Sequence, residues 1–254
     1  MKLADVHCHL ESRRFDGDRE NVVRRFEKVG GRFMICSGTS FDNNRKVLEL
    51  SRRFGVVRAS FGLYTVGNLS GDVDSELRWI EEHVEDCVAV GECGFDFDGE
   101  DSRVQFERQK VLFEKQIDLA LKLRKPLVVH SRKAEVEAVD ILEAKGARDV
   151  VMHCFCGKKA LIKRGIENGW YFSVPPAILR WDNFKMLVDM VPLNQLLTET
   201  DAPYLGPVAR ERNESANVVV ALREIARIKG MSVEDVADRV WKNFEKVFGL
   251  GSVY

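Results

Sequence analysis

Residues 103–131 read RVQFERQKVLFEKQIDLALKLRKPLVVHS and hold one helix pattern followed by one strand pattern. The apolar side chains that stand among polar neighbours in the first part are Phe106, Val111, Phe113, Ile117 and Leu121. Their recurrence predicts an amphipathic helix over residues 103–123. The run KPLVVHS (125–131) is short and mostly apolar, which is typical of a strand buried on both faces, and a histidine, His130, stands near its end.

The same alternation of apolar runs and amphipathic segments recurs roughly every 30 residues along the chain. The runs predict strands at 3–8, 32–37, 56–62, 87–92, 125–131, 149–155, 170–174 and 195–200. Helices are predicted at 19–29, 43–54, 73–84, 103–123, 134–144, 158–169, 216–230 and 232–249. Repeated right-handed crossovers predict an α/β fold, a closed (β/α)8 TIM barrel that forms a single domain over residues 1–254. An open, doubly wound parallel sheet is the alternative.

Charge and cysteine content exclude some classes of protein. The net charge of −1, from 39 basic and 40 acidic residues, argues against a protein that coats nucleic acid by bulk charge. The six cysteines are scattered without a CxxC pair, and polar residues interrupt the N-terminal segment, so we expect a cytoplasmic protein without a secretory signal. No stretch approaches about 18 apolar residues, so no membrane partner is expected.

The segment DVHCHL (5–10) places two of the five histidines one residue apart, at the end of the first predicted strand. Alternate side chains of a strand share a face, so His7 and His9 should project one way and Cys8 the other. Two neighbouring imidazoles can hold one metal ion. They can also be ordinary strand histidines that form hydrogen bonds at a surface.

More polar residues stand at or just after the ends of predicted strands, where a (β/α)8 barrel carries its active site. These residues are Glu92 in VGECG, His130 in PLVVHS, His153 in VVMHCF and Asp201 in TETDAP. Each has an ordinary structural explanation alone, but together with His7 and His9 they exceed what one ion needs. The set predicts two divalent ions bridged by a carboxylate. Imidazole and carboxylate ligands suit Zn, Mn, Fe or, with more water, Mg.

Five motifs in this order resemble the TatD family of metal-dependent hydrolases: DVHCHLE, GECGFDF, VVHSRKA, MHCFCG and TETDAPYL. The resemblance assigns the metal ligands to His7, His9, Glu92, His130, His153 and Asp201. It implies catalytic roles for two of them, with Glu92 bridging the ions and Asp201 acting as the general base. Glu199 of the same TETD motif is expected just behind the ligands, and we group it with the substrate-binding residues.

Three stretches depart from the family pattern. The family usually has a Gly-x-His-Pro-His motif after the third strand, whereas this chain has GLYTV (62–66), without a histidine. Substrate preference is therefore open at this loop. In RNESANV (212–218), Ser215 stands where the family usually has proline. In HCFCG, Cys156 replaces a small polar residue, and it is a minor candidate for a metal contact.

Family members are reported as metal-dependent deoxyribonucleases, often 3′→5′ exonucleases, so the resemblance implies a DNA phosphodiesterase that uses a metal-activated water. Basic residues in the loops after predicted strands could bind phosphate, and we select Arg132 and Lys158 for this role. The others are Arg13, Arg14, Lys133, Lys159, Lys163, Arg164, Arg210 and Arg212. Surface Lys and Arg are common everywhere, so this rim could also be coincidental.

Four aromatic residues near the predicted rim could stack a base or simply pack on the barrel: Tyr64, Phe95, Phe97 and Phe155. The metals alone do not name the substrate. A hydrolase of a small amide, ester or lactone, or of aminoacyl-tRNA, is the alternative, and a non-catalytic metal- or nucleic-acid-binding protein is a third hypothesis. A monomer without an obligate protein partner is expected.

Overall fold

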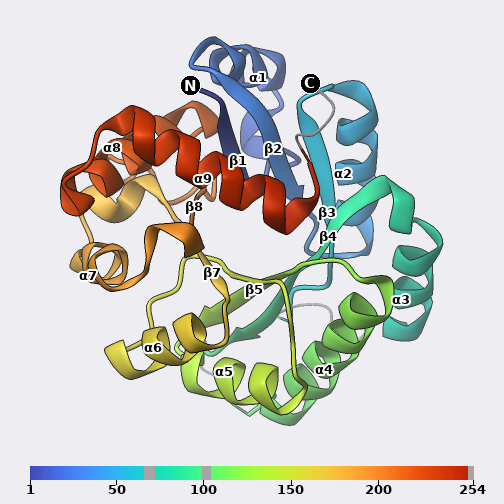
Figure 1. The fold of residues 1–254 in the computed structure, drawn as a ribbon. Helices are drawn as coiled ribbons and strands as arrows, with labels where there is room; N and C mark the ends of the chain where they lie inside the picture. The colour runs from blue at the N-terminus through green and yellow to red at the C-terminus, as the bar shows by residue number, and fades with distance from the viewer. Residues whose placement is uncertain (66–71, 99–103, 251–254) are drawn as a thin grey trace.

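A computed structural model describes residues 1–65, 72–98 and 104–250 of the chain, and in it eight parallel strands form a barrel (Figure 1). The strands are β1 (Leu3–Cys8), β2 (Gly31–Ser37), β3 (Val57–Phe61), β4 (Cys87–Asp96), β5 (Leu127–Arg132), β6 (Val150–Met152), β7 (Tyr171–Val174) and β8 (Leu196–Thr198). Each strand pairs with the next in chain order. A bridge between Cys8 and Ala202 joins the two ends of the sheet. The TIM-barrel prediction is therefore confirmed, and the open sheet is wrong.

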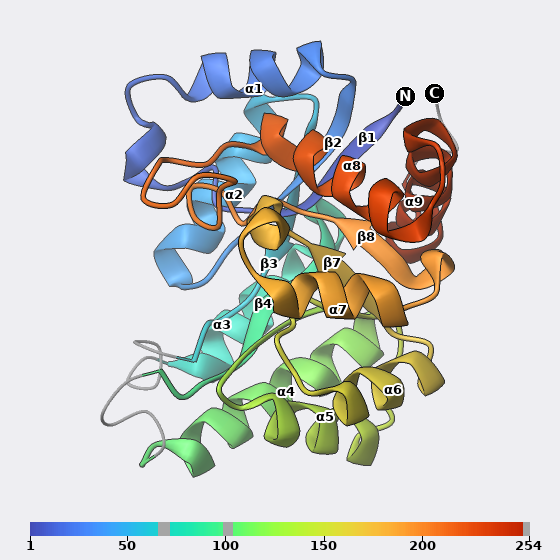
Figure 2. The same cartoon turned by 90° about the vertical axis from the view of Figure 1, so that its left-hand side faces the viewer.

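Helices surround the strands on the outside, as Figures 1 and 2 show. They are α1 (Arg19–Lys28), α2 (Phe41–Arg53), α3 (Val73–Glu82), α4 (Phe106–Leu123), α5 (Glu135–Ala144), α6 (Lys159–Glu167), α7 (Asp182–Met190), α8 (Val218–Lys229) and α9 (Val233–Phe248). Short 3₁₀ helices lie at Arg13–Phe15, Val84–Asp86, Pro176–Leu179, Leu193–Gln195 and Ser215–Asn217. Of the helices that the structure describes, none is both long and apolar enough to cross a membrane.

Two expectations about helices need correction. Helix α7 was not predicted at all. In α4, Val111 is 52% exposed and Leu121 is 39% exposed, so two of the five apolar residues used to predict this amphipathic helix do not lie on its buried face. Val111 precedes the buried Phe113 by two residues, which places it about 200° away around the helix. Arg103, the first residue of the predicted helix, lies outside the described residues.

Helix α9 closes the N-terminal end of the barrel. Barrel residues from seven strands pack in one cluster with α9: Ala4, Val6, Phe33, Ile35, Ala89, Val128, Val151, Tyr171 and Leu197. Trp241, Phe244, Val247 and Phe248 are the α9 members of this cluster. Phe244 is fully buried, and truncating such a side chain to alanine costs about 3–5 kcal/mol. With this end filled, the accessible end of the barrel is the one where the strands finish.

A register shift in β1 directs the histidines to that accessible end. The pairing of β1 with β2 shifts between Asp5 and Cys8. Val6, within this interval, packs with the barrel cluster that contains α9, whereas Cys8, at its end, packs in the other core cluster. Strict alternation would place Val6 and Cys8 on one face. The irregularity therefore reverses the faces, as β-bulges beside active sites commonly do.

Strands β6 and β8 end two or more residues earlier than the sequence predicts. The ladders of β6 and β8 end at Met152 and Thr198, so the predicted extents 149–155 and 195–200 are wrong beyond these residues. The backbone leaves the strand conformation soon afterwards, with φ of 45° at Cys154 and 52° at Asp201. His153 and Asp201 therefore lie on the turns that follow the strands, at the accessible end of the barrel.

Candidate metal centre

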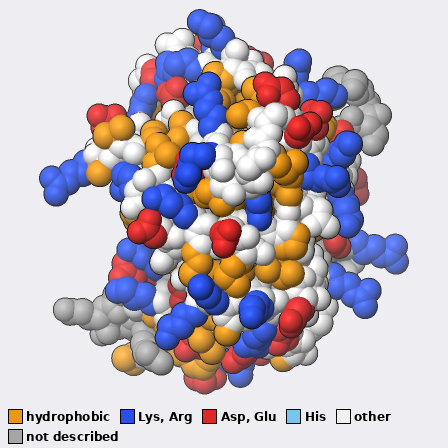
Figure 3. Space-filling view, turned by 60° about the vertical axis from the view of Figure 1, so that its left-hand side comes forward, with side chains coloured by type: hydrophobic (Ala, Val, Ile, Leu, Met, Phe, Trp, Pro, Cys, Tyr) orange, Lys and Arg blue, Asp and Glu red, His pale blue; other side chains and the backbone are white. Residues whose placement is uncertain are grey.

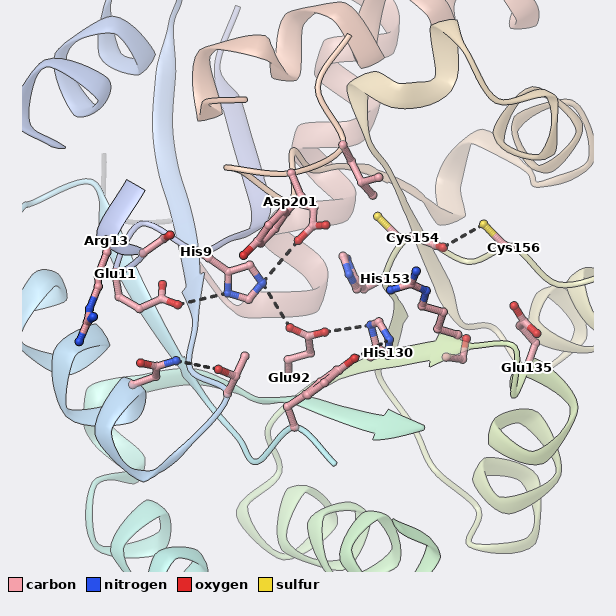
Figure 4. A pocket seen from close by; sticks show the side chains of 18 of the residues that line it. His9, Glu11, Arg13, Glu92, His130, Glu135, His153, Cys154, Cys156 and Asp201 are labelled. Atoms are coloured by element: carbon pink, nitrogen blue, oxygen red, sulfur yellow. Dashed lines mark hydrogen bonds and ion pairs between the residues drawn. The ribbon is translucent and has the colours of Figure 1, made fainter. Parts of the chain in front are cut away.

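Four side chains bring a compact set of metal-binding atoms together: His7 and His9 at the end of β1, Glu92 in the middle of β4 and Asp201 after β8. Figure 4 shows His9, Glu92 and Asp201 facing one another. His7 Nε2 and His9 Nε2 are 3.3 Å apart, and Glu92 Oε2 lies 3.4 Å from each of them. Asp201 Oδ1 lies 3.4 Å from His9 Nε2 and 3.7 Å from His7 Nε2. Donors about 2.1 Å from one ion at tetrahedral angles are about 3.4 Å apart. The spacing of these four atoms therefore fits a single cation.

The other oxygen of Glu92 faces a second group of donors. Glu92 Oε1 lies 3.0 Å from His130 Nδ1. Glu92, His130 and His153 each offer an atom within 4.8 Å of the other two. The structure thus gathers all six predicted ligands at one end of the barrel, with one carboxylate common to both groups.

A buried carboxylate fixes the tautomer of His153. Glu199 Oε2 lies 2.7 Å from His153 Nδ1, and Ser173 Oγ donates to the same oxygen at 2.8 Å. The backbone N–H of Cys154 donates to Glu199 Oε1 at 3.0 Å. An ionised carboxylate only accepts hydrogen bonds, so Nδ1 of His153 carries a proton, and the neutral form of this ring has its lone pair on Nε2. Glu199 is fully buried, which favours a position behind His153 over contact with substrate.

Acceptors also stand behind His9. His9 Nδ1 lies 3.2 Å from the carbonyl oxygen of Ser37 and 3.4 Å from Glu11 Oε1. The proton of His9 therefore resides on Nδ1, which leaves the Nε2 lone pair facing Glu92. His7 is held by the same serine, because Ser37 Oγ lies 3.1 Å from His7 Nδ1.

His130 has its own pair of partners. Its Nε2 lies 3.4 Å from Asp96 Oδ2 and 3.3 Å from the hydroxyl of Tyr64, which donates to Asp96. These contacts leave Nδ1 of His130 to face Glu92. Tyr64 belongs to GLYTV, the stretch that departs from the family pattern. The last residue of that stretch, Val66, lies outside the described residues.

Helix α4 holds the two partners of His130, Tyr64 and Asp96, in place through two buried glutamines. Gln116 accepts a hydrogen bond from the N–H of Leu63 at 2.7 Å and donates to the Leu63 carbonyl at 3.0 Å. Gln109 does the same for Asp96, at 3.1 and 3.2 Å. The amide groups thus satisfy the backbone where it leaves β3 and β4, next to Tyr64 and at Asp96.

The electrostatics favour ionised carboxylates beside these imidazoles. Burial alone would raise the pKa of Glu199, but the charge of His153 and its hydrogen bond lower that pKa to about 2. Burial would likewise raise the pKa of Glu92, yet His7 and His130 hold it well below its usual range. Burial and the neighbouring His153 lower the pKa of His7, which favours the neutral imidazole that metals bind. Both carboxylates are therefore anionic at neutral pH.

A buried aspartate ties the first and last strands together beneath the site. Asp5 accepts hydrogen bonds from Thr200 N at 2.9 Å, Thr200 Oγ1 at 2.6 Å and His7 N at 3.3 Å. Burial raises the pKa of Asp5 to about 7, against hydrogen bonds from Ser215 and Thr200 that lower it. Ser215, which stands where the family usually has proline, thus contributes a hydroxyl to this carboxylate.

Five of the six donor residues line a cavity of about 870 Å³, and the sixth, His7, is buried behind them. Arg132 lines it, but Arg132 and Lys133 both pair with Asp98. Lys158 is exposed at the start of α6 and is not among the residues that line the cavity. The substrate-binding roles of Arg132 and Lys158 stay predictions.

Aromatic and sulfur-containing side chains also line the cavity. Of the four aromatic residues considered from the sequence, Tyr64 lines it, whereas the following are buried in the core: Phe95, Phe97 and Phe155. Sequence reasoning missed Trp181 and Tyr204, which line the cavity and are 41% and 52% exposed. It also missed Glu11 and Asp96, whose only signal is their place within the motifs DVHCHLE and GECGFDF. Cys156 lines the cavity too, and its thiol donates to the carbonyl of Cys154.

Comparison with known proteins places the whole chain in one family. The sequence model of the family described as "TatD related DNase" matches residues 4–249. The human protein named "Deoxyribonuclease TATDN3" is 33% identical over 258 residues, which cover 97% of this chain and 94% of the human protein. A Pantoea ananatis protein named "3′-5′ ssDNA/RNA exonuclease TatD" is 30% identical over 262 residues, covering 98% of this chain and 100% of that protein.

Comparison with solved structures supports the same family. The crystal structure of YJJV, a TatD homologue from Escherichia coli K12, superposes with a TM-score of 0.90 at 26% identity and covers 98% of each chain. The matched segment contains every residue of the donor groups described above. The chain therefore belongs to the TatD family of DNases.

Proposed function

We propose that this chain is a divalent-metal-dependent phosphodiesterase that hydrolyses DNA and removes nucleotides from a 3′ end. The observation that carries the proposal is the position of Glu92. Its two carboxylate oxygens face two different groups of donors, as a carboxylate shared by two cations requires. The family and the names of the two relatives support DNA as the substrate class, and not the alternative of a small amide, ester, lactone or aminoacyl-tRNA.

The donor set fits two ions. The first would be held by His7, His9, Glu92 and Asp201, and the second by Glu92, His130 and His153. Mixed imidazole and carboxylate donors suit Zn or Mn, and Mg where water completes the shell. Such ions, when bound, polarise a phosphoryl oxygen and lower the pKa of water toward about 7.

The protein supplies a proton acceptor and a fixed geometry. Asp201 lines the cavity, and the carboxylate oxygen that would not hold the first ion, Oδ2, would accept the proton of the attacking water. The N–H of Asp201 donates to the carbonyl of His7 at 2.9 Å, so the barrel seam fixes this carboxylate relative to the histidine pair. Such positioning is what hydrolysis of a phosphodiester demands, because the enzyme contributes orientation and charge stabilisation.

We further propose that the enzyme works as a monomer in the cytoplasm. All six cysteines are unpaired, and four of them are buried. Free cysteines in such number are typical of a reducing compartment.

Single-stranded DNA labelled at either end tests the proposal. With Mn²⁺ present, the 5′-labelled strand should shorten stepwise, whereas the 3′-labelled strand should release labelled mononucleotide first. Asp201→Asn should reduce the rate by at least about 10²-fold, the lower range for a lost general base. Its folded state is checked by circular dichroism. Undiminished shortening in excess EDTA would contradict the proposal.

A further inference from the structure

We infer that a single nucleic-acid strand enters the cavity over one half of its rim, which we call the β7–β2 arc: Trp181, Tyr204, Arg13 and Lys46. Bases stack on the two aromatic rings, and phosphates pair with the two cations. This inference rests on the proposed function, since it names the surface that holds the same substrate.

The cations of the arc are available to a phosphate. Arg13 and Lys46 line the cavity and are exposed. Within residues 1–65, 72–98 and 104–250, neither forms an ion pair with a carboxylate at 4.0 Å or less. Glu11, close to Arg13 in sequence, is engaged elsewhere, because its carboxylate faces His9 and accepts from Cys36. Figure 4 shows Arg13 across the site from Cys156.

The opposite half of the rim is electrostatically different. Arg132 and Lys133 share the carboxylate of Asp98, so much of their positive charge is compensated. Glu135 adds a carboxylate to the cavity wall on this half. Basic, acidic and hydrophobic side chains are interspersed over the described part of the face seen in Figure 3. The uncompensated cations of the cavity wall lie instead after β1 and β2.

The aromatic rings of the arc are held in fixed orientations. Trp181 is 41% exposed and stacks on Phe184 with ring centroids 5.7 Å apart and planes only 6° apart. Tyr204 is 52% exposed, with the guanidinium of Arg14 5.8 Å from its ring centroid. The Tyr204 ring also lies 6.3 Å from the ring of His9. A large exposed aromatic side chain that is already ordered gives a base a stacking surface at little entropic cost.

The four side chains follow one another around the barrel. Trp181 comes after β7, Tyr204 after β8, Arg13 after β1 and Lys46 in the helix after β2. Those strands are consecutive neighbours, since β8 meets β1 at the seam. Stacking surfaces and phosphate partners thus lie side by side, which is how proteins hold a single strand.

Binding of fluorescein-labelled single-stranded DNA tests the cations. All proteins carry Asp201→Asn and are loaded with Mn²⁺, so affinity is measured without cleavage. Arg13→Ala/Lys46→Ala should weaken binding and reduce the salt slope of log K by about 1.4, from about 0.7 for each lost phosphate contact. Arg132→Ala/Lys158→Ala removes equal charge from the other half and should change the slope less. An equal or larger change in this comparison variant would overturn the inference.

Stacking is tested separately. Trp181→Ala should raise the Kd about tenfold, within the range for one lost base–aromatic contact, and Trp181→Phe should recover most of the loss. Leu179→Ala is the matched control, because Leu179 is 47% exposed and does not line the cavity. With an oligonucleotide abasic at its last three 3′ positions, Trp181→Ala should have little further effect. Equal effects of Trp181→Ala on normal and abasic strands would overturn the stacking assignment.

The two proposals fail in distinguishable ways. If the otherwise unmodified protein leaves DNA intact under every metal while binding follows the pattern above, the proposed function is wrong and the arc stands. If that protein shortens DNA but the arc variants bind like their parent, the arc alone is wrong.

Discussion

Glu199 and His153 form a buried pair behind the metal centre, with Glu199 Oε2 2.7 Å from His153 Nδ1 and both side chains at most 3% exposed. The same arrangement occurs twice more, with Glu11 behind His9 and Asp96 behind His130. In each case the carboxylate contacts the ring nitrogen that points away from the proposed metal, and the other nitrogen faces the metal-binding atoms. Such partners orient a ligand ring and raise its basicity.

Replacing Glu199 by glutamine should weaken metal binding. Glu199→Gln removes the negative charge that holds the His153 proton. The NH₂ group of the glutamine would also face the N–H of Cys154, so two hydrogen-bond donors would meet where a donor now meets an acceptor. Loss of such a partner typically lowers metal affinity by about 10–100-fold. Competition with a fluorescent chelator measures the affinity, and Glu211→Gln, at an exposed site, is the control. Unchanged affinity in Glu199→Gln would show that the pair is dispensable.

Strand β4 can pack against β5 beside His130 only because residue 94 is a glycine. It has a φ of +130°, and a Cβ there would lie 2.0 Å from the carbonyl oxygen of His130. Gly94→Ala should therefore push β4 from β5 and lower the free energy of unfolding by about 2 kcal/mol or more. A Cβ at Gly55 would meet no atom within 4 Å, so Gly55→Ala should change the free energy of unfolding by less than about 0.5 kcal/mol. Urea denaturation compares the two, and a neutral Gly94→Ala would contradict the described packing.

The Cys156 thiol should react slowly despite facing the cavity. Burial raises its pKa to about 11, so at pH 8 the folded protein holds far less thiolate than an ordinary cysteine does. Its iodoacetamide alkylation, followed by peptide mass spectrometry, should rise about tenfold per pH unit from pH 8 to 10. In guanidinium the rate should level off above about pH 8.5, the usual cysteine pKa. A plateau near pH 9 in the folded protein would contradict the raised pKa.

The barrel and the six donor residues could be predicted because their signals are local. Each strand shows as a short apolar run, and the rule that barrel sites lie at strand C-termini places His130 and Asp201 together without long-range information. Alternation correctly relates His7 to His9, but only the register shift in β1 determines which face they share.

The rest depends on contacts between distant segments. Nothing local shows that Asp98 compensates Arg132, or that Glu199 reaches His153. Helix α7 was missed although its buried Phe184, Leu187 and Val188 follow the i, i+3, i+4 spacing of an amphipathic helix. Trp181, next to α7, was missed with it.

The central claim, a two-ion centre that hydrolyses DNA, is tested most directly by titrating metal-stripped protein with Mn²⁺. Bound metal and release of nucleotides from single-stranded DNA are measured on the same samples, with Asp201→Asn in parallel. The account predicts no turnover in the stripped protein, a plateau near two ions per chain, and at least a 10²-fold lower rate in the variant. Undiminished turnover without metal, or intact DNA with two ions bound, would contradict it.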